Sequence, residues 1–253
     1  MNCSQATRIL FAHMAVVIIP AAGLGTRMAP LGKDKKPAAT KQFVELHGVP
    51  VVVHTLRQFA ENPEISEIFV ALRKSEISSF RARLERDSPE ILTKKKVVLL
   101  EGGEHRQQSV ANALAAVKSS ADEIVLVHDA VRPFVSAEII NDVIIAAKKH
   151  GAAITGVPAA DTIKQVERTA DGALIKATIP REKIVLAQTP QGFRYDVLKK
   201  AFDEAAADGF VGTDEASLVE RSGHPVAVVM GSPRNIKITT PADLDLAEFF
   251  LKR

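Results

Sequence analysis

The chain has 253 residues, of which 46% are hydrophobic and 25% charged, a composition typical of a globular protein that can bury a substantial core. Its 33 basic and 30 acidic residues give a net charge of +3, too small to indicate a nucleic-acid partner. The single cysteine, Cys3, excludes an intrachain disulfide and favours a reducing, cytoplasmic location. No apolar run reaches the roughly 18 residues of a membrane span, so we expect no membrane as partner. Because the net charge is small, we expect no nucleic acid either.

Residues 1–14 form an N-terminal tail ahead of the first predicted strand. Its short apolar run around Leu10 is too short for the hydrophobic region of a secretion signal, and no clear cleavage site follows. Because Met14 stands directly before the strand, the tail is either an appendage or the product of an upstream start, and the sequence leaves both open.

An apolar run rich in β-branched residues at 15–19 predicts a strand buried on both faces. Strand-like runs and helical spacing then alternate along the chain. The predicted strands cover residues 68–72, 97–100 and 124–127. The predicted helices cover residues 51–61, 75–86, 106–118 and 136–149, with Ser75 and Ser136 as N-caps and a stop near Gly151. This alternation predicts an α/β fold, with a mostly parallel, twisted sheet and helices on both faces.

The pattern changes after residue 152. Residues 153–158, 162–166 and 174–178 are strand-like, and Asp171-Gly172 is typical of a hairpin turn. We predict a β-arm over residues 158–183, inserted into a single domain that spans residues 15–253. An isolated hairpin is not stable, so the arm needs a surface to pack on, and a second copy of the chain is the simplest one.

Helical spacing returns at residues 195–207, followed by a short helix with Thr213 as its predicted cap. A strand is predicted at residues 226–230, and a last helix begins at Thr240-Pro241, an N-cap followed by proline in the first helical position.

Ligands of open α/β sheets bind at the carboxyl ends of the strands, which directs attention to the turn after the first strand. The turn consists of Pro20-Ala21-Ala22-Gly23-Leu24-Gly25-Thr26-Arg27-Met28. Small residues let backbone N–H groups approach a phosphate, and Arg27 adds a fixed charge. Met28 stands where a dinucleotide-binding turn has its third glycine, and no Gly-Lys-Ser/Thr follows, so the turn is neither that motif nor a P-loop. A plain strand-to-helix turn is the alternative.

A basic loop follows this turn, with Lys33, Lys35, Lys36 and Lys41. A solvated surface is the better interpretation for most of these lysines. Lys41 differs because apolar sequence resumes directly after it, and we predict that it is held in place.

A second candidate site follows the strand at 124–127. Asp129 there could hold a divalent cation or ribose hydroxyls, and Arg132 could bind an anionic group through two hydrogen bonds. The alternative for Asp129 is a turn or helix cap, and His128 is predicted to be a packed structural histidine. A third, weaker candidate is the Gly102-Gly103 turn, whose backbone could approach a base closely.

Eight motifs follow one another along the chain: Pro20-Ala-Ala-Gly-x-Gly-x-Arg27-Met28, Lys41-Gln42-Phe43, Gly102-Gly103-x-x-Arg106-x-x-Ser109-Val110, His128-Asp129-Ala130-x-Arg132-Pro133, Asp161-Thr162-Ile163-Lys164, Thr189-Pro190-Gln191, Thr213-Asp214-Glu215-Ala216 and Asn235-Ile236-Lys237-Ile238-Thr239. Through these motifs the chain resembles the 2-C-methyl-D-erythritol 4-phosphate cytidylyltransferase family from about Ala15 to Lys252. Each motif alone is modest, but eight in one order form a strong signal. The resemblance departs at the loop between Arg27 and Lys41, which is longer than the family pattern.

The resemblance implies a Rossmann-like nucleotidyltransferase fold and cytidylyl transfer from CTP to 2-C-methyl-D-erythritol 4-phosphate with Mg²⁺, releasing pyrophosphate. It implies that Arg27 and Lys41 stabilise charge at the α-phosphate, and that Lys237 and Arg181 position the acceptor's phosphate. The implied nucleotide-binding residues are Pro20, Ala21, Ala22, Gly23, Gly25, Gly103, Ser109, Asp129 and Ala130, with Asp129 also facing the metal. The implied substrate-binding residues are Arg132, Asp161, Thr162, Thr189 and Thr213. The family's arm crosses to a partner subunit, which implies a homodimer whose arm residues complete the neighbouring site.

Several other functions share parts of this pattern. A ribitol 5-phosphate cytidylyltransferase has overlapping motifs and is the nearest alternative, and a sugar-1-phosphate nucleotidyltransferase is a more distant one. A nucleotide-binding oxidoreductase is disfavoured by Met28. A regulatory nucleotide-binding module would have no need for Arg27, Lys41, Arg181 and Lys237 together.

Overall fold

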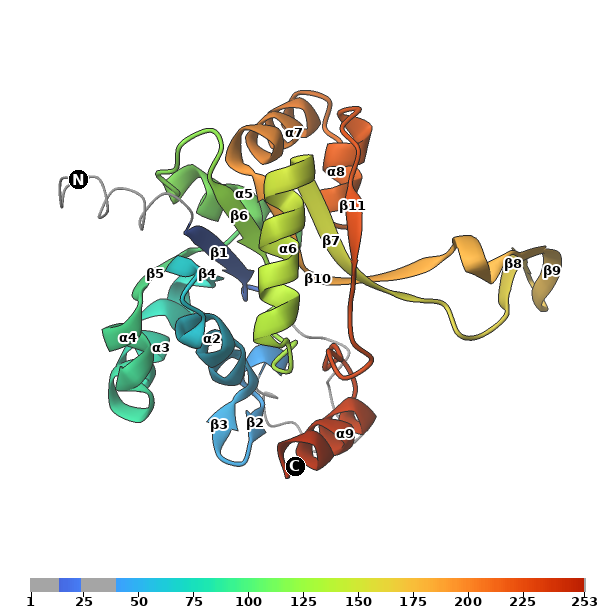
Figure 1. Ribbon diagram of the computed structural model, residues 1–253. Helices are drawn as coiled ribbons and strands as arrows, with labels where there is room; N and C mark the ends of the chain where they lie inside the picture. Colours follow the sequence, from blue (N-terminus) through green and yellow to red (C-terminus); the bar gives the residue numbers. More distant parts are fainter. Residues whose placement is uncertain (1–13, 24–39, 253) are drawn as a thin grey trace.

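The computed structural model describes residues 14–23 and 40–252, and a seven-stranded sheet forms its centre (Figure 1). The strand order is β11-β7-β10-β6-β1-β4-β5. The strands are β1 (Ala15–Pro20), β4 (Ile65–Leu72), β5 (Lys96–Glu101), β6 (Ile124–Val127), β7 (Ala152–Pro158), β10 (Val185–Arg194) and β11 (Ala227–Met230). Of these seven strands only β10 runs against its neighbours, β6 and β7. The predicted mostly parallel α/β sheet is therefore confirmed.

Strand β1 lies inside the sheet between β4 and β6, and its side chains alternate between two cores. Val17 and Ile19 belong to the core on one face, and Val16 and Ile18 belong to the core on the other. All four are buried, as expected for a strand covered on both faces. This burial fixes the end of β1, from which residues 20–23 of the following turn begin.

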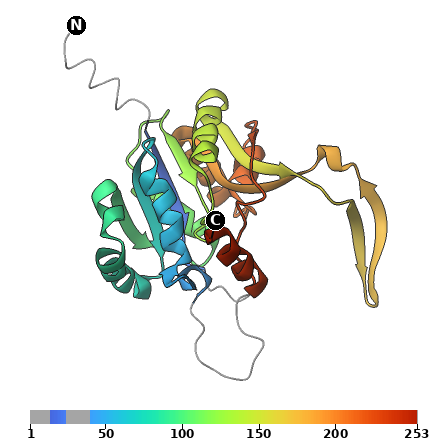
Figure 2. The ribbon, with the colours of Figure 1, turned by 60° about the horizontal axis from the view of Figure 1, so that its bottom comes forward.

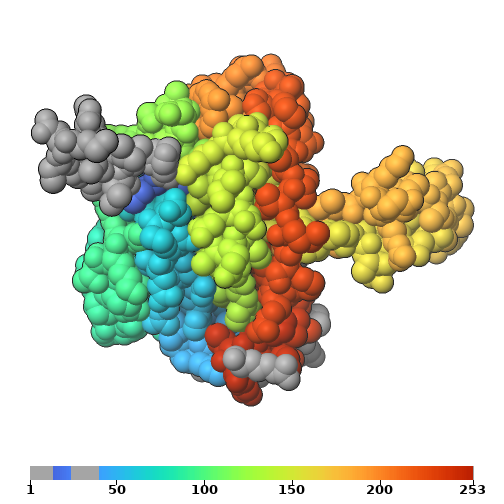
Figure 3. Space-filling model, in the orientation of Figure 1, coloured from blue at the N-terminus to red at the C-terminus, as the bar shows by residue number. Residues whose placement is uncertain are grey.

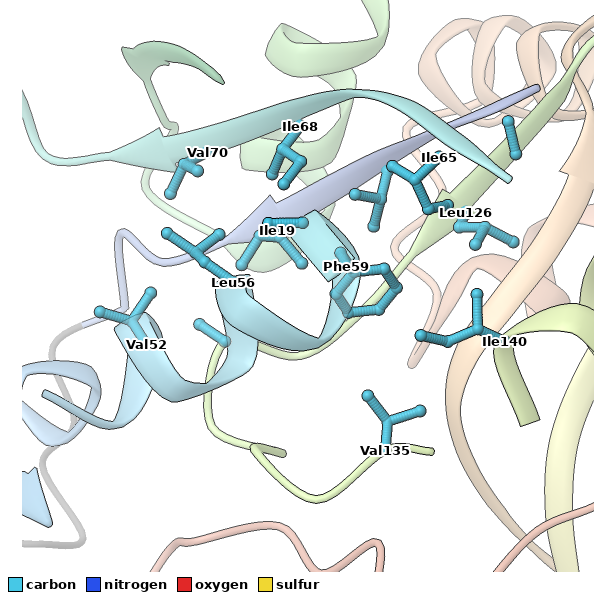
Figure 4. Close-up of a cluster of buried hydrophobic side chains, with 14 of the residues drawn as sticks. Ile19, Val52, Leu56, Phe59, Ile65, Ile68, Val70, Leu126, Val135 and Ile140 are labelled. Carbon is cyan, nitrogen blue, oxygen red and sulfur yellow. The ribbon is translucent and has the colours of Figure 1, made fainter. Parts of the chain in front are cut away.

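Helices cover both faces of the sheet (Figures 1 and 2). One face carries α2 (Val51–Glu61), α3 (Lys74–Asp87), α4 (Pro89–Lys94) and α6 (Ala137–His150), and the other carries α5 (Arg106–Ala116), α7 (Tyr195–Ala207) and α8 (Glu215–Arg221). Figure 4 shows Leu56 and Phe59 of α2 packed over Ile19 of β1 and Ile68 of β4. Each such side chain, fully removed from water, contributes roughly 1.5–3 kcal/mol.

The ends of α6 are those that the sequence predicts. The Ser136 hydroxyl accepts a hydrogen bond from the Ile139 backbone N–H at 3.3 Å. At the other end, Gly151 adopts φ 83°, a left-handed conformation that glycine takes without steric cost.

The predicted starts of two other helices are wrong. Helix α3 begins at Lys74 with Arg73 as N-cap, so Ser75 lies inside the helix and makes no capping bond. Helix α8 is capped by Asp214 rather than Thr213. The Asp214 carboxylate accepts from the Ser217 N–H at 3.0 Å, and the Ser217 hydroxyl accepts from the Asp214 N–H at 3.4 Å. The result is a capping box, in which both donors are satisfied reciprocally.

Strand β10 is absent from the predicted elements. Pro190 lies in its middle, and a proline in a strand removes one donor from the hydrogen-bond ladder. The pairing with β7 shifts register between Gln188 and Gln191, which accommodates Pro190 and its cis peptide bond with Thr189. The strand then continues to Arg194 between β6 and β7.

Strands β8 (Ile163–Thr169) and β9 (Gly172–Ile179) form a hairpin that projects from the body of the molecule (Figures 2 and 3). The turn falls at residues 170–171, one residue before the predicted Asp171-Gly172, and Gly172 begins β9 with φ 140°. Among the described residues the two strands pair only with each other. Their large apolar side chains Val166, Leu174 and Ile175 are exposed.

The last helix, α9 (Pro241–Leu251), packs beside β2 (Glu45–Leu46), which pairs with β3 (Val49–Pro50), and Thr240 caps the helix as predicted. A third apolar cluster joins Leu46, Val131, Ile238 and Ala247. This cluster brings the segment before α9, which contains Lys237, against the loop after β6. No helix in residues 14–23 and 40–252 has the length and apolar character needed to cross a membrane.

Candidate active site

A pocket lies at the edge of the sheet where β1, β5 and β6 end, and residues that follow each of these strands line it. Its lining comes from the turn after β1, the short helix η2 (Lys41–Phe43), the start of α5, the loop after β6 and the segment before α9. The lining residues are Pro20, Ala21, Ala22, Gly23, Lys41, Gln42, Gly103, Glu104, His105, Arg106, Ser109, Asp129, Ala130, Val131 and Lys237. Ten of the predicted site residues are among them, whereas Gly25 and Arg27 lie outside the described residues.

The described part of the turn after β1, residues 20–23, is held by side chains from two other segments. Gln42 is buried, and its Nε2 donates to the carbonyl of Ala21 at 2.7 Å and to that of Gly23 at 3.2 Å. Arg73 donates from Nε to the carbonyl of Ala22 at 3.2 Å. Lys41 precedes Gln42 in η2, so the contact that fixes the turn also places Lys41 at the pocket, as the sequence predicts. A structural role for Gln42 is missing from the sequence prediction, although the residue stands in the Lys41-Gln42-Phe43 motif.

The Gly102-Gly103 turn is glycine because other groups approach it closely. A Cβ atom at Gly102 would lie 2.6 Å from the Ala22 Cβ, and one at Gly103 would lie 1.9 Å from the Gln108 Cγ. The Ser109 hydroxyl accepts from the Gly103 N–H at 3.0 Å and donates to the His105 carbonyl at 3.1 Å. Ser109 therefore shapes the pocket wall, in addition to lining it.

Asp129 is the centre of a cluster of cations. Its Oδ1 accepts from Arg106 Nε at 3.3 Å, and its Oδ2 accepts from Lys237 Nζ at 2.8 Å and Arg132 Nε at 3.3 Å. Burial alone would raise the pKa of Asp129, but the nearby charges of Arg106, Lys237 and Arg132 hold the pKa well below its ordinary value. Asp129 is thus ionised, and it orients Arg106 and Lys237 at the pocket and Arg132 outside the pocket lining.

Arg106 and Glu215 form an ion pair that the sequence does not predict, in which the carboxylate is buried and the arginine is half-buried. Glu215 is 1% exposed, and its two carboxylate oxygens lie 2.7 and 2.8 Å from Arg106 Nη1. Burial would lower the pKa of Arg106, but the carboxylates of Glu215 and Asp129 outweigh that effect and raise it. Both residues stand in the motifs quoted above, each at the first position of a helix, which was the available signal.

His128 is fully buried, confirming that it is a structural residue. The Asp129 N–H donates to Thr189 Oγ1 at 3.0 Å, Thr189 Oγ1 lies 3.1 Å from His128 Nδ1, and His128 Nε2 lies 3.0 Å from the Arg132 carbonyl. Because a carbonyl only accepts, His128 carries its proton on Nε2 and Nδ1 accepts from the Thr189 hydroxyl. Burial lowers the pKa of His128 to about 4, so the imidazole is neutral.

The remaining predicted residues lie outside the pocket lining. Arg132 is bonded to Asp129 and donates from Nη1 to the Asn235 carbonyl at 2.7 Å, and Thr189 is buried beneath Asp129. Thr213 is exposed in the loop before α8. Asp161, Thr162 and Arg181 are exposed at the base of the projecting hairpin, where Arg181 Nη1 donates to the Ala160 carbonyl at 2.7 Å. Within one chain, the arm residues and the pocket are not brought together.

The side chains at the pocket indicate how the predicted Mg²⁺ could be bound. Within residues 14–23 and 40–252, no group of three or more His, Cys, Asp or Glu side chains could hold an ion. Mg²⁺ commonly uses one or two carboxylates together with substrate phosphates and water, and a single ionised Asp129 fits that mode of binding. A closed site built from protein ligands alone does not fit.

Comparison with known proteins agrees with this geometry. The family model described as 2-C-methyl-D-erythritol 4-phosphate cytidylyltransferase matches residues 15–253. The chain is 58% identical to the protein of that name from Acidobacterium capsulatum, over 94% of this chain and 97% of the relative. It is 49% identical to the one from Solibacter usitatus, over 93% and 95%.

Solved structures give the same result. The crystal structure of the Francisella tularensis 2-C-methyl-D-erythritol 4-phosphate cytidylyltransferase superimposes with a TM-score of 0.76 at 37% identity, covering 93% of this chain and 99% of that one. The 4-diphosphocytidyl-2C-methyl-D-erythritol synthase of Anaerococcus prevotii superimposes with a TM-score of 0.77 at 30% identity, covering 95% and 99%. With the family model matching residues 15–253 and relatives of that name covering nearly its whole length, this chain belongs to the 2-C-methyl-D-erythritol 4-phosphate cytidylyltransferase family.

Proposed function

We propose that the pocket around Asp129 transfers the cytidylyl group of CTP to 2-C-methyl-D-erythritol 4-phosphate, in the non-mevalonate route to isoprenoids. A phosphate oxygen of the acceptor attacks the α-phosphorus of CTP. A new P–O bond forms as the bond to the β-phosphate breaks, giving 4-CDP-2-C-methyl-D-erythritol and pyrophosphate. Membership of the family gives the reaction, and the pocket is the place where this chain carries it out.

One observation carries the assignment to this pocket: three cationic side chains from distant segments line it. Lys41, Arg106 and Lys237 come from η2, α5 and the segment before α9. Phosphoryl transfer requires positioning and charge stabilisation more than a proton acceptor. A set of fixed cations beside a small-residue turn supplies both, and the buried neutral His128 is not needed as a base.

The cations divide the work between the two substrates. Lys41, together with Arg27, stabilises the negative charge that grows at the α-phosphate in the transition state. Lys237, oriented by Asp129 at 2.8 Å, binds the phosphate of the acceptor. The backbone of residues 20–23, with Gly25, Gly103, Ser109 and Ala130, contacts the cytidine and the triphosphate.

Mg²⁺ is the cofactor that we propose, with Asp129 as its protein ligand. When bound, the ion neutralises triphosphate charge and thereby favours departure of pyrophosphate. Arg106 and Arg132 hold the Asp129 carboxylate in a defined orientation toward the pocket.

A homodimer formed through the arm completes the proposal. The arm exposes apolar Val166, Leu174 and Ile175, and the strands at its base expose Leu186 and Met230. Exposed apolar side chains gathered in this way are typical of an interface between protein chains. Arg181, Asp161 and Thr162 of the partner subunit would contact the acceptor. Arg132, Thr189 and Thr213 of the chain that holds the pocket would complete the acceptor site. A single cysteine in the sequence supports a cytoplasmic location.

Pyrophosphate release tests the function directly. The purified protein is assayed with Mg²⁺, each of the four nucleoside triphosphates, and either 2-C-methyl-D-erythritol 4-phosphate or ribitol 5-phosphate. We expect turnover only with CTP and the methylerythritol acceptor, and loss of turnover when the divalent cation is chelated. Turnover with ribitol 5-phosphate and none with methylerythritol phosphate would refute the assignment.

A further inference from the structure

Glu215 is a buried carboxylate that does not line the pocket yet contacts a residue that does. It is the first residue of α8, it is 1% exposed, and both of its oxygens accept from Arg106 Nη1. Arg106 in turn donates from Nε to Asp129 Oδ1. Glu215 is therefore one residue removed from Asp129 and two removed from Lys237.

A second set of contacts fixes Glu215 from the sheet. Gln191 of β10 is 1% exposed, and its Nε2 donates to Asp214 Oδ2 at 2.7 Å while its Oε1 accepts from the Ala216 N–H at 3.1 Å. The residues on both sides of Glu215 are thus bonded to one side chain of a central strand. This arrangement gives the Glu215 carboxylate a defined position.

Stability alone is a poor explanation for this ion pair. Removing the Glu215 carboxylate from water costs about as much as its attraction to the half-buried Arg106 returns, and well-packed apolar residues often stabilise a protein equally well. The ion pair instead fixes geometry. Arg106 has two carboxylate neighbours, and its bonds to Glu215 determine which of its nitrogen atoms can reach Asp129.

We propose that Glu215 is a positioning residue for the transfer reaction: it holds Arg106 by Nη1, so that only Nε reaches Asp129, at Oδ1, and Oδ2 stays with Lys237 and Arg132. An arginine prefers to bind a carboxylate through two parallel bonds. Without Glu215, Arg106 turns to bind both oxygens of Asp129 and displaces Lys237 from Oδ2. The acceptor's phosphate then meets a misplaced ammonium group. This inference rests on the role proposed for Lys237.

The test is a Glu215→Gln substitution, which keeps the shape of the side chain and removes its charge. Glu90→Gln is the matched control, because Glu90 also lies in the first turn of a helix and pairs with an arginine, Arg57, at 3.1 Å, away from the pocket. We expect Glu215→Gln to lower kcat/KM for the acceptor at least tenfold, chiefly through KM, and Glu90→Gln to stay near the wild-type value. Wild-type kinetics in Glu215→Gln would overturn the proposal.

A double substitution separates positioning from a general loss of structure. If Glu215 acts through Lys237, adding Glu215→Gln to Lys237→Ala lowers kcat/KM no further than Lys237→Ala alone. A double variant as impaired as the product of the two single effects would refute action through Lys237. Turnover by the wild-type protein in the same assay tests the transfer function separately.

Should Glu215→Gln lower the melting temperature below that of the assay, Arg106→Lys replaces it. Lysine keeps the charge beside Glu215 but cannot bond two carboxylates from a rigid planar group. We expect the same loss in kcat/KM for the acceptor, and wild-type kinetics in Arg106→Lys would overturn the proposal.

Discussion

Lys41 occupies a position that is fixed by its neighbour, since Gln42 is bonded to the carbonyls of Ala21 and Gly23. We predict that Lys41→Ala lowers kcat on the order of 10²-fold, because it removes a charge that acts on the transition state. Lys36→Ala, in the preceding basic loop, should leave kcat within about twofold of wild type. Steady-state kinetics with CTP and the methylerythritol acceptor provide the measurement. Equal losses in the two variants would refute the assignment of Lys41.

His128 gives a second prediction, which concerns stability. Its pKa is about 4 in the folded chain, against an ordinary value of 6.5, so at pH 5 the unfolded chain binds the additional proton. The contribution of the neutral His128 to the free energy of unfolding is therefore complete above pH 6.5. It is lost as the pH falls from 6.5 towards 4, to a total of about 3 kcal/mol. Urea denaturation at pH 7.5 and pH 5 should show the loss in the wild-type protein.

A His128→Asn variant should be less stable at pH 7.5 but show a smaller decrease between the two pH values, because the buried imidazole is gone. His150→Asn, at an exposed histidine at the end of α6, serves as the control and should retain the wild-type decrease. If His128→Asn keeps the full decrease, another group is responsible for it.

The sequence anticipates single residues when their signal is local. Lys41 is distinguished by the apolar segment beside it, and His128 by its place at the end of an apolar strand. The pair of Arg106 with Glu215 joins positions 109 residues apart, and only the packing of the chain in three dimensions reveals it. Charge spacing along the chain contains no such information.

Within residues 14–23 and 40–252, the two strands of the arm pair only with each other, and this has a measurable consequence. Replacing residues 163–179 with a short Gly/Ser linker should leave the sheet and its two cores intact, because β8 and β9 pair only with each other among the described residues. We expect a folded protein with a melting temperature close to wild type, but monomeric and nearly inactive. Size-exclusion chromatography with light scattering measures the oligomeric state, and pyrophosphate release measures the activity. A fully active dimer from this variant would contradict the proposed role of the arm.

Errors in the predicted elements have identifiable causes. Ser75 and Thr213 are good capping residues, but Arg73 and Asp214 take those places, so the cap of α3 lies earlier in the chain than predicted and that of α8 lies later. Strand β10 escapes prediction because Pro190 argues against a central strand, whereas the actual strand accommodates it through a register shift. The ends of α6 agree with the prediction because no other favourable capping residue stands directly beside Ser136 or Gly151 in the sequence.

At the scale of the whole molecule, the proposed active site draws on two chains. Mixing Arg27→Ala chains with Arg181→Ala chains should restore part of the activity, because a mixed dimer contains one site with both wild-type residues. Each variant alone should be nearly inactive. Differently tagged chains allow the mixed dimer to be isolated before the assay. If isolated mixed dimers show no more activity than either parent, each site is complete within a single chain.

The fold class follows from the sequence because alternating strand and helix signals leave few arrangements other than a parallel sheet covered on both faces. The pocket was also foreseeable in outline, since the carboxyl ends of β1 and β6 lie side by side in such a sheet. The contribution of Lys237 depends instead on α9 packing back beside β2, a long-range contact that periodicity alone does not predict.

Strand β10 has a consequence for how the chain can change in length. It enters from the arm, passes Thr189 beneath Asp129 and Gln191 beside α8, and ends at α7. Inserting or deleting one residue within it would turn every later side chain of the strand to the opposite face of the sheet. The hairpin turn at residues 170–171 has no such constraint, because no other described strand pairs with the hairpin. Length variation is therefore tolerated at the tip of the arm and excluded in the strand that leads back from it.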